Sequence, residues 1–248
     1  AGREAYRARY DELMEAERHA GRMHLPAHTG PYGPGGPCMA PGLYRMNLDT
    51  AMDVDATDPR QLTDAINASR HRVFEALAFL RKYCPGAANI HLVATGALFG
   101  VRESRRFRGM ASVSGEDVIA ARKREDGICR ASFYLDLHDG KPAAEKRRAR
   151  AEDKPAPGDW YEIAFGCLVP EAVDGLLIAG RCISSDRRGN GSLRIMPTCM
   201  GLGQAAGTAA ALCAAEGTQP RDLPVPRVQE VLRDRYGVRM AHELAAEA

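Results

Sequence analysis

The chain has 248 residues, of which 45% are hydrophobic and 27% are charged, ordinary values for a globular protein with a sizeable core. Its formal net charge of +2 favours neither a nucleic-acid partner nor an acidic ligand. The sequence shows no signal peptide and no apolar run near the ~20 residues that span a bilayer, so we expect no nucleic acid and no membrane among its partners.

Two helices and a strand are predicted in the first part of the chain. Apolar residues at helical spacing predict a helix over residues 3–20. Asp58 and Pro59 supply an N-cap and a first-turn proline for a second helix, which Pro85 ends. Residues 90–101 form an apolar run that predicts a strand.

The middle of the chain mixes a helix, a strand and a charged loop. Ser114 and Asp117 form a capping box, and we expect the helix that they open to run to about residue 126. Residues 131–138 alternate apolar and polar side chains, which is typical of a half-buried strand. Residues 141–158 are rich in charge and predict a solvated loop.

The C-terminal part predicts two further strands, over residues 160–168 and 175–180. A helix rich in glycine and alanine follows over residues 197–216, and a short helix over residues 226–236 closes the pattern. The elements together predict an α/β fold.

Gly201, Gly203 and Gly207 spell G-x-G-x-x-x-G, which is similar to a nucleotide-binding loop. Such a loop must stand directly between a strand and a helix, whereas the nearest predicted strand ends at Gly180. We therefore interpret the glycines as part of a helix that packs closely on a flat partner, either a flat ring or a neighbouring strand. A helix–sheet contact without any ligand is the alternative.

The N-terminal end of this predicted helix is suited to bind a particular kind of chemical group. A helix N-terminus presents unpaired amides and about half a positive charge, which suits an electron-rich carbonyl or a developing anion. The N1–C2 edge of a reduced flavin is a group of this kind.

Tyr134, Asp136 and His138 alternate along the predicted strand 131–138. Side chains two residues apart share a face of a strand, so a phenol, a carboxylate and an imidazole would stand together as a proton-transfer set. A structural His–Asp pair is the alternative.

Arg102, Arg105 and Arg106 lie in the segment VRESRR. Guanidinium groups in this pattern would hold a substrate carboxylate or stabilise an enolate. Pairing of Arg102 with Glu103 or with a neighbour at a domain boundary is the alternative.

The seven cysteines contain no C-x-x-C and no Cys/His spacing typical of a metal site. Reduced, mostly buried thiols in a cytoplasmic protein are expected, and no metal.

The segment DGLLIAGRCISSDRRGNGSLRIMPTCMGLGQAAGTAAAL resembles the C-terminal flavin-contacting signature of the FAD-dependent oxidoreductase family, a branch of the glutathione-reductase-like flavoproteins. FLRKYCPG, GVRESRRFRG and YEIAFGCLVP resemble further motifs of this family, in the family's order. The resemblance extends from about residue 1 to residue 238.

The resemblance implies a substrate domain with a mixed β-sheet over residues 1–168, followed by the C-terminal strand and helix of a Rossmann-like FAD-binding domain over residues 169–248. Family members begin with a strand, a G-x-G-x-x-G turn and a helix that bind the ADP half of FAD, and this sequence contains no such turn. The resemblance thus covers the C-terminal half, and we expect a partner polypeptide or a missing N-terminal half to supply the rest.

The resemblance also assigns residues. It places Arg181 facing the cofactor, and it places four residues where the helix meets the flavin pyrimidine edge through the amides of residues 200 and 201: Ser192, Met200, Gly201 and Gln204. Hydride would pass between a small organic substrate and flavin N5. His138 or Tyr134 would move the proton, and Arg105 would hold an anionic or carbonyl group.

Two positions depart from the family's pattern, Gly166 in AFGCL and Arg187 in SSDRRGNG, and either would alter specificity if it touches the substrate. The rival interpretation is a non-catalytic subunit, or a remnant without cofactor, that pairs with a separate FAD-binding chain. A nucleotide-binding module that uses GLGQAAG directly is disfavoured by the missing strand.

Overall fold

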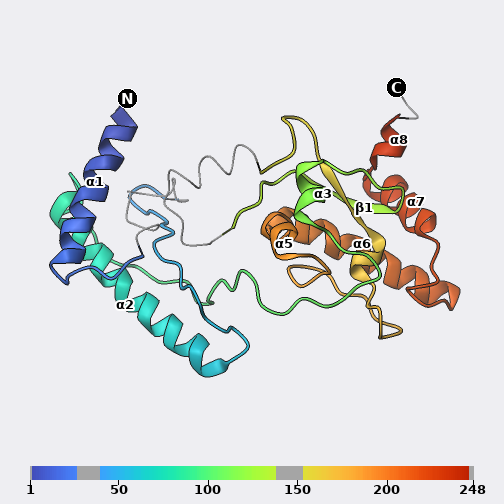
Figure 1. The fold of residues 1–248 in the computed structure, drawn as a ribbon, viewed down its shortest axis with the longest axis horizontal. Helices are drawn as coiled ribbons and strands as arrows, with labels where there is room; N and C mark the ends of the chain where they lie inside the picture. The colour runs from blue at the N-terminus through green and yellow to red at the C-terminus, as the bar shows by residue number, and fades with distance from the viewer. Residues whose placement is uncertain (1, 27–39, 138–152, 246–248) are drawn as a thin grey trace. The chain divides into compact units, whose positions relative to one another are not determined.

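The computed structural model describes residues 2–26, 40–137 and 153–245 (Figure 1). It divides into two compact units, one within Ala1–Val101 and one that begins at Arg102 and extends to the C-terminus. Each unit has its own hydrophobic core. The predicted boundary after residue 168 concerns which part of a family fold each segment belongs to, and it stays a prediction.

The N-terminal unit is built on helices α1 (Gly2–His19) and α2 (Pro59–Tyr83), as the helical spacing predicts. Asp58 caps α2 by accepting a hydrogen bond from the amide of Arg60. The two helices share a core that includes the rings of Tyr10 and Phe79, which meet edge to face with centroids 5.8 Å apart.

A buried carboxylate reinforces the contact between α1 and α2. Glu17 on α1 accepts hydrogen bonds from Lys82 Nζ at 2.8 Å and from the hydroxyl of Tyr83 at 2.5 Å, both on α2. Arg22 Nε donates to its other oxygen at 2.6 Å. The hydrogen bond from Arg22, followed by those from Lys82 and Tyr83, holds the pKa of Glu17 far below its ordinary value.

The strand predicted over residues 90–101 is wrong. These residues have no regular secondary structure, and Val93 and Leu98 are among the most exposed apolar side chains described. A strand requires a hydrogen-bonding neighbour, and within the described residues this segment has none. Its apolar composition therefore predicted a strand that no partner completes.

The C-terminal unit contains the one sheet of the described residues, in which β1 (Gly127–Ala131) and β2 (Tyr161–Ala164) pair antiparallel. Cys129 lies opposite Ile163 in the register. All four residues of β2 are buried, and the 3-10 helix η1 (Phe165–Leu168) follows at once. The mixture of helix and strand is confirmed, in a smaller and purely antiparallel form, while the Rossmann-like detail stays a prediction.

Besides the strand pair, this unit contains the helices labelled in Figure 1 as α3 (Gly115–Ile119), α5 (Arg187–Leu193), α6 (Met196–Glu216), α7 (Val225–Tyr236) and α8 (Ala241–Ala245). The long helix α6 packs against β1 and α7. The predicted capping box of Ser114 and Asp117 is present. However, α3 ends well before residue 126, because Ala121 takes a left-handed backbone conformation, with φ of 48°, that no α-helix continues through.

Three predicted strands of this unit, over residues 131–138, 160–168 and 175–180, differ from what the structure shows. The strand expected over residues 131–138 ends at Ala131, and a local turn follows in which the Leu137 amide donates to the Leu135 carbonyl at 3.0 Å. The strand expected over residues 160–168 stops at Ala164 and continues as η1.

Residues 176–179 have no assigned strand, although the Ile178 amide donates to the Leu168 carbonyl at 2.9 Å. A β-ladder needs a row of such bonds, and a single one does not make a strand. No helix among the described residues is both long enough and apolar enough to cross a bilayer.

Candidate functional site

The corner between α5 and α6 brings together the features that the sequence singled out. Asp186 fixes the start of α5, since its carboxylate accepts from the Gly189 amide at 2.6 Å and from the Gly115 amide at 3.1 Å. Arg194 is the C-cap residue of α5, and α6 begins at Met196. An arginine and the positive end of a long helix dipole are therefore adjacent.

The first turn of α6 is uncapped and open. No side chain caps Ile195, the N-cap residue, and the Cys199 amide donates to its carbonyl at 3.0 Å. Pro197 has no N–H, so the amides of Met196 and Thr198 are left without an intrahelical acceptor. Met196 is 77% exposed and Met200 is 74% exposed, whereas Thr198 is buried, so one side of this helix end faces away from the core.

Met200 and Gly201 lie in the second turn of α6, where amides bond to carbonyls four residues earlier. The predicted flavin contact through the amides of residues 200 and 201 stays a prediction, and the amides without an intrahelical acceptor are those of Met196 and Thr198. Met200, Gly201 and the exposed Gln204 border the open end of the helix.

The three glycines of G-x-G-x-x-x-G have different surroundings. A β-carbon on Gly201 would lie 2.8 Å from Cys129 Sγ, so packing on β1 requires this glycine. A β-carbon on Gly203 or Gly207 would meet no atom within 4 Å. Contacts within the described chain therefore explain one glycine and leave two facing open space.

Both faces of α6 are apolar or small. The buried face carries Leu202, Ala205 and Ala209, while the exposed face carries Gly203, Gly207, Ala210, Ala211 and Ala214. A helix that is apolar all round is normally covered on every side. The open face thus fits a flat partner at close range, whether a cofactor ring or another polypeptide segment.

Two arginines meet at Asp136, and one of them, Arg194, directly precedes the N-cap residue of α6. Arg194 donates through one NH2 nitrogen to the carbonyl of Asp136 at 2.5 Å and to its carboxylate Oδ2 at 3.3 Å. A guanidinium nitrogen of Arg102 lies 3.7 Å from the same Oδ2. Burial, followed by the charge of Arg102, lowers the pKa of Arg194. Asp136 is thus a counterion shared by two guanidinium groups.

A second shared carboxylate follows the same pattern. Glu103 lies 3.7 Å from a guanidinium nitrogen of Arg106 and 3.3 Å from Nε of Arg187. Arg106 Nε also donates to the carbonyl of Ser185 at 3.1 Å. Of the two alternatives for Arg102, pairing with Glu103 is not seen among the described residues, whereas pairing with another neighbouring carboxylate is, because Arg102 forms an ion pair with Asp136.

The two described residues of the predicted proton-transfer set, Tyr134 and Asp136, lie outside any assigned strand, and Asp136 is at the centre of the turn closed by Leu135 and Leu137. Tyr134 is half-buried and its ring stacks on that of Phe133, with centroids 4.2 Å apart. Asp136 is held by Arg194. His138 lies outside the described residues, so its place in this set stays a prediction.

The remaining predicted residues that the structure describes differ in their surroundings. Arg105 is exposed and forms no ion pair with the described residues. Arg181 is exposed, and its carbonyl accepts a hydrogen bond at 2.8 Å from Nδ2 of the fully buried Asn190. The hydroxyl of Ser192 is buried between Tyr161 and the carbonyl of Phe133, to which it donates at 2.5 Å. Ser192 therefore holds the 133–136 segment in place.

Arg194 and Asn190 are the residues that sequence reasoning missed. The pattern SLRIMP offered a signal, because a cation immediately before the proline-marked start of a helix is placed against the helix dipole and needs a compensating carboxylate. Nothing in the sequence alone showed that Asp136 supplies it.

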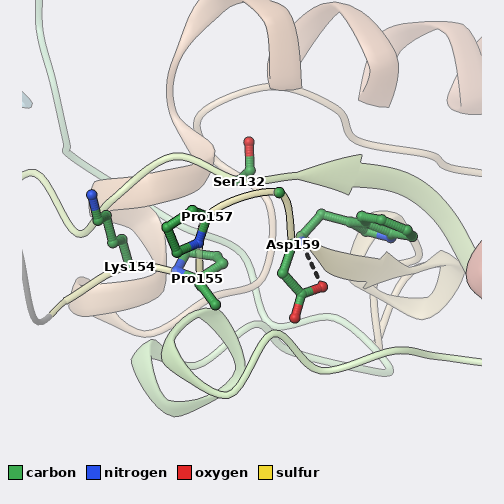
Figure 2. A pocket seen from close by; sticks show the side chains of 8 residues that line it. Ser132, Lys154, Pro155, Pro157 and Asp159 are labelled. Atoms are coloured by element: carbon green, nitrogen blue, oxygen red, sulfur yellow. Dashed lines mark hydrogen bonds between the residues drawn. The ribbon is translucent and has the colours of Figure 1, made fainter.

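The hollow in Figure 2 lies elsewhere in the C-terminal unit. It has a volume of about 370 Å³ and is lined by Ser132 and by residues 154–160. Lys123 and Arg130 approach the Trp160 ring at 4.5 Å and 5.3 Å from its centroid. No predicted site residue lines this hollow.

The thiols fit a structural role. The six described cysteines are all free, and burial raises the pKa of Cys129 and of Cys167 to about 12. Within the described ranges no cluster of three or more His, Cys, Asp or Glu side chains could hold a metal ion.

A comparison with known protein families shows to which family the chain belongs. The profile of the family described as FAD dependent oxidoreductase matches residues 4–232. The chain belongs to the FAD-dependent oxidoreductase family. FAD is accordingly the cofactor of the redox chemistry. No curated protein and no solved structure matches this member of the family.

Proposed function

We propose that this chain forms the substrate-bearing part of an FAD-dependent oxidoreductase that transfers hydride between a small organic substrate and FAD. The observation that carries the proposal is the open, uncapped first turn of α6 beside a group of arginines. Bound FAD supplies the hydride acceptor or donor, and the protein supplies orientation and electrostatics.

On the cofactor side, the free amides of Met196 and Thr198 would donate to the pyrimidine edge of the ring. Arg181 would add positive charge from the preceding loop, and Met200 and Gln204 would border the ring. Gly201 lets α6 lie tightly on β1, which fixes the direction of the amide end.

On the substrate side, Arg105 would hold an anionic or carbonyl group, since its guanidinium is exposed and forms no ion pair with the described residues. Tyr134 or His138 would move the proton. Asp136 is bound to Arg194, so it would act by holding the arginines and not as a free base.

A further polypeptide segment would complete the site. The sequence contains no strand–G-x-G-x-x-G–helix motif for the ADP half of FAD, which a partner chain or an N-terminal half would supply. The open face of α6 around Gly203 and Gly207 is the surface on which we propose that it docks. In this proposal residues 1–168 are the substrate domain and residues 169–248 complete a Rossmann-like FAD domain.

The second candidate is a non-catalytic subunit or a remnant without cofactor, and the missing turn favours it. Titration of the purified chain with FAD separates the two. A flavin oxidoreductase acquires the visible absorption band of bound flavin and quenches flavin fluorescence. A chain that stays colourless at every FAD concentration supports the second candidate.

A further inference from the structure

The four arginines around Asp136 and Glu103 carry more positive charge than these two carboxylates neutralise. Asp136 is shared by Arg102 and Arg194, and Glu103 is shared by Arg106 and Arg187. Each of these two groups therefore has two cations to one anion among the described residues. Gathering like charges in a partly desolvated place is unfavourable unless a further anion joins them.

Of these four arginines, Arg102 is the one without a hydrogen bond to the described residues. Its side chain is 45% exposed, and its distance of 3.7 Å to Asp136 is an ion pair too long for a hydrogen bond. It forms no hydrogen bond to the described residues, although a guanidinium offers five N–H donors in a planar fork. The fork matches the two oxygens of a carboxylate.

Arg194 stands behind Arg102 as a fixed cation. Its side chain is only 6% exposed, and its hydrogen bonds to Asp136 prevent it from turning outward. Its charge keeps the potential positive at Arg102, whatever the exposed side chains nearby do.

We infer that the substrate of the proposed oxidoreductase carries a carboxylate, which binds to the Arg102 fork with Arg194 behind it. That the bound anion is a substrate rests on the proposed function, whereas the anion site itself is argued from the side chains of Arg102, Arg194 and Asp136 alone. The carboxylate of the substrate would neutralise the positive charge of Arg102 and Arg194 that Asp136 alone does not neutralise.

Ligand-observed NMR titration of the purified chain with succinate tests the inference, with succinamide as the neutral analogue of the same shape and inorganic phosphate as a second anion. The variants are Arg102→Gln and a matched control, Arg108→Gln, which removes the same charge from a side chain that is 88% exposed. Arg102→Lys keeps the charge and removes the fork.

We expect succinate to bind more tightly than succinamide or phosphate. Arg102→Gln should weaken succinate binding by roughly tenfold to a hundredfold, the range for losing charge-assisted hydrogen bonds. Arg102→Lys should weaken it by less, and Arg108→Gln should leave it unchanged.

The inference is overturned if succinate and succinamide bind alike, or if Arg102→Gln and Arg108→Gln behave alike. Equal binding of phosphate and succinate, lost together in Arg102→Gln, would indicate an adventitious ion only and would overturn it too. FAD titration of the same samples keeps the proposals separate: flavin binding without Arg102-dependent succinate binding sinks this inference, and the reverse sinks the proposed function.

Discussion

Cys129 on β1 packs directly against Gly201 on α6: its sulfur lies 2.8 Å from the position that a β-carbon on Gly201 would take. This contact sets how closely the helix approaches the strand pair. It also shows that the first glycine of GLGQAAG serves packing within the chain and not a phosphate.

Gly201→Ala should therefore destabilise the C-terminal unit. Overpacking costs about 1–3 kcal/mol, and the ~1 kcal/mol that alanine gains over glycine inside a helix offsets only part of it. Urea unfolding followed by the fluorescence of Trp160, the one tryptophan of the chain, measures the change. In the Cys129→Ala background the same substitution should cost less, and equal costs in both backgrounds would show that the two residues are not coupled.

Gly203→Ala and Gly207→Ala should have the opposite effect on stability and should stabilise the chain. Both glycines lie inside a helix and face open space, so alanine should raise the free energy of unfolding of the chain by about 1 kcal/mol at each position. The same urea experiment measures it. A loss of stability at either position would show that α6 already has a close neighbour there.

Gly203→Ala and Gly207→Ala should also weaken the binding of the flat partner that we propose on the exposed face of α6. If a flat partner lies on this face, added methyl groups push it away, so a gain in chain stability should accompany weaker FAD binding. Flavin fluorescence quenching by the variants measures it. Unchanged FAD binding would separate the glycines from the cofactor and its supporting segment.

The pH dependence of the N-terminal unit should follow Glu17. Its pKa is lowered in the folded state, so its stabilising contribution is present above the ordinary value of 4.5 and is lost as the pH falls below that value. Hydrogen exchange of α1 peptides, measured from neutral to acid pH, should show this loss in the native sequence. Glu17→Gln should exchange faster at neutral pH and show a smaller pH dependence.

Glu15→Gln is the control for that experiment, because Glu15 is half-exposed on the same helix and, within the described part of the chain, pairs with Arg18 and His19 alone. It should change exchange little at any pH. Equal effects of the two variants would show that the Glu17 cluster does not hold α1 on α2.

Thiol labelling should sort the cysteines by burial. Cys129 and Cys167, each with a pKa raised to about 12, should remain unlabelled by iodoacetamide at mildly alkaline pH, while the half-buried Cys84 and Cys182 react. Peptide mass spectrometry measures the extent at each site. Rapid labelling of Cys129 would contradict its contact with Gly201.

The helices could be predicted from sequence because their signals are local. Asp58 caps α2, and Ser114 with Asp117 forms the capping box of α3, as their spacing indicates. Strands depend on distant partners, so the apolar residues 176–179 looked like a strand although their described backbone bond is the single one from Ile178 to Leu168.

The candidate site divides in the same way. The open helix end after Pro197 follows from local sequence, whereas the burial of Arg194 against Asp136 depends on a fold that brings separate segments together. The alternation of Tyr134 and Asp136 misled, because it assumes an extended strand where the chain turns.

The central claim is that the amide end of α6 meets the pyrimidine edge of the flavin ring. Lumiflavin, which consists of the isoalloxazine ring without the ADP portion, tests it directly through hydrogen exchange of the chain with and without the ligand. We expect slower exchange in the peptide that contains Met196 and Thr198, and no change around Trp160. Protection confined to the hollow beside Trp160, or protection nowhere in the chain, would contradict it.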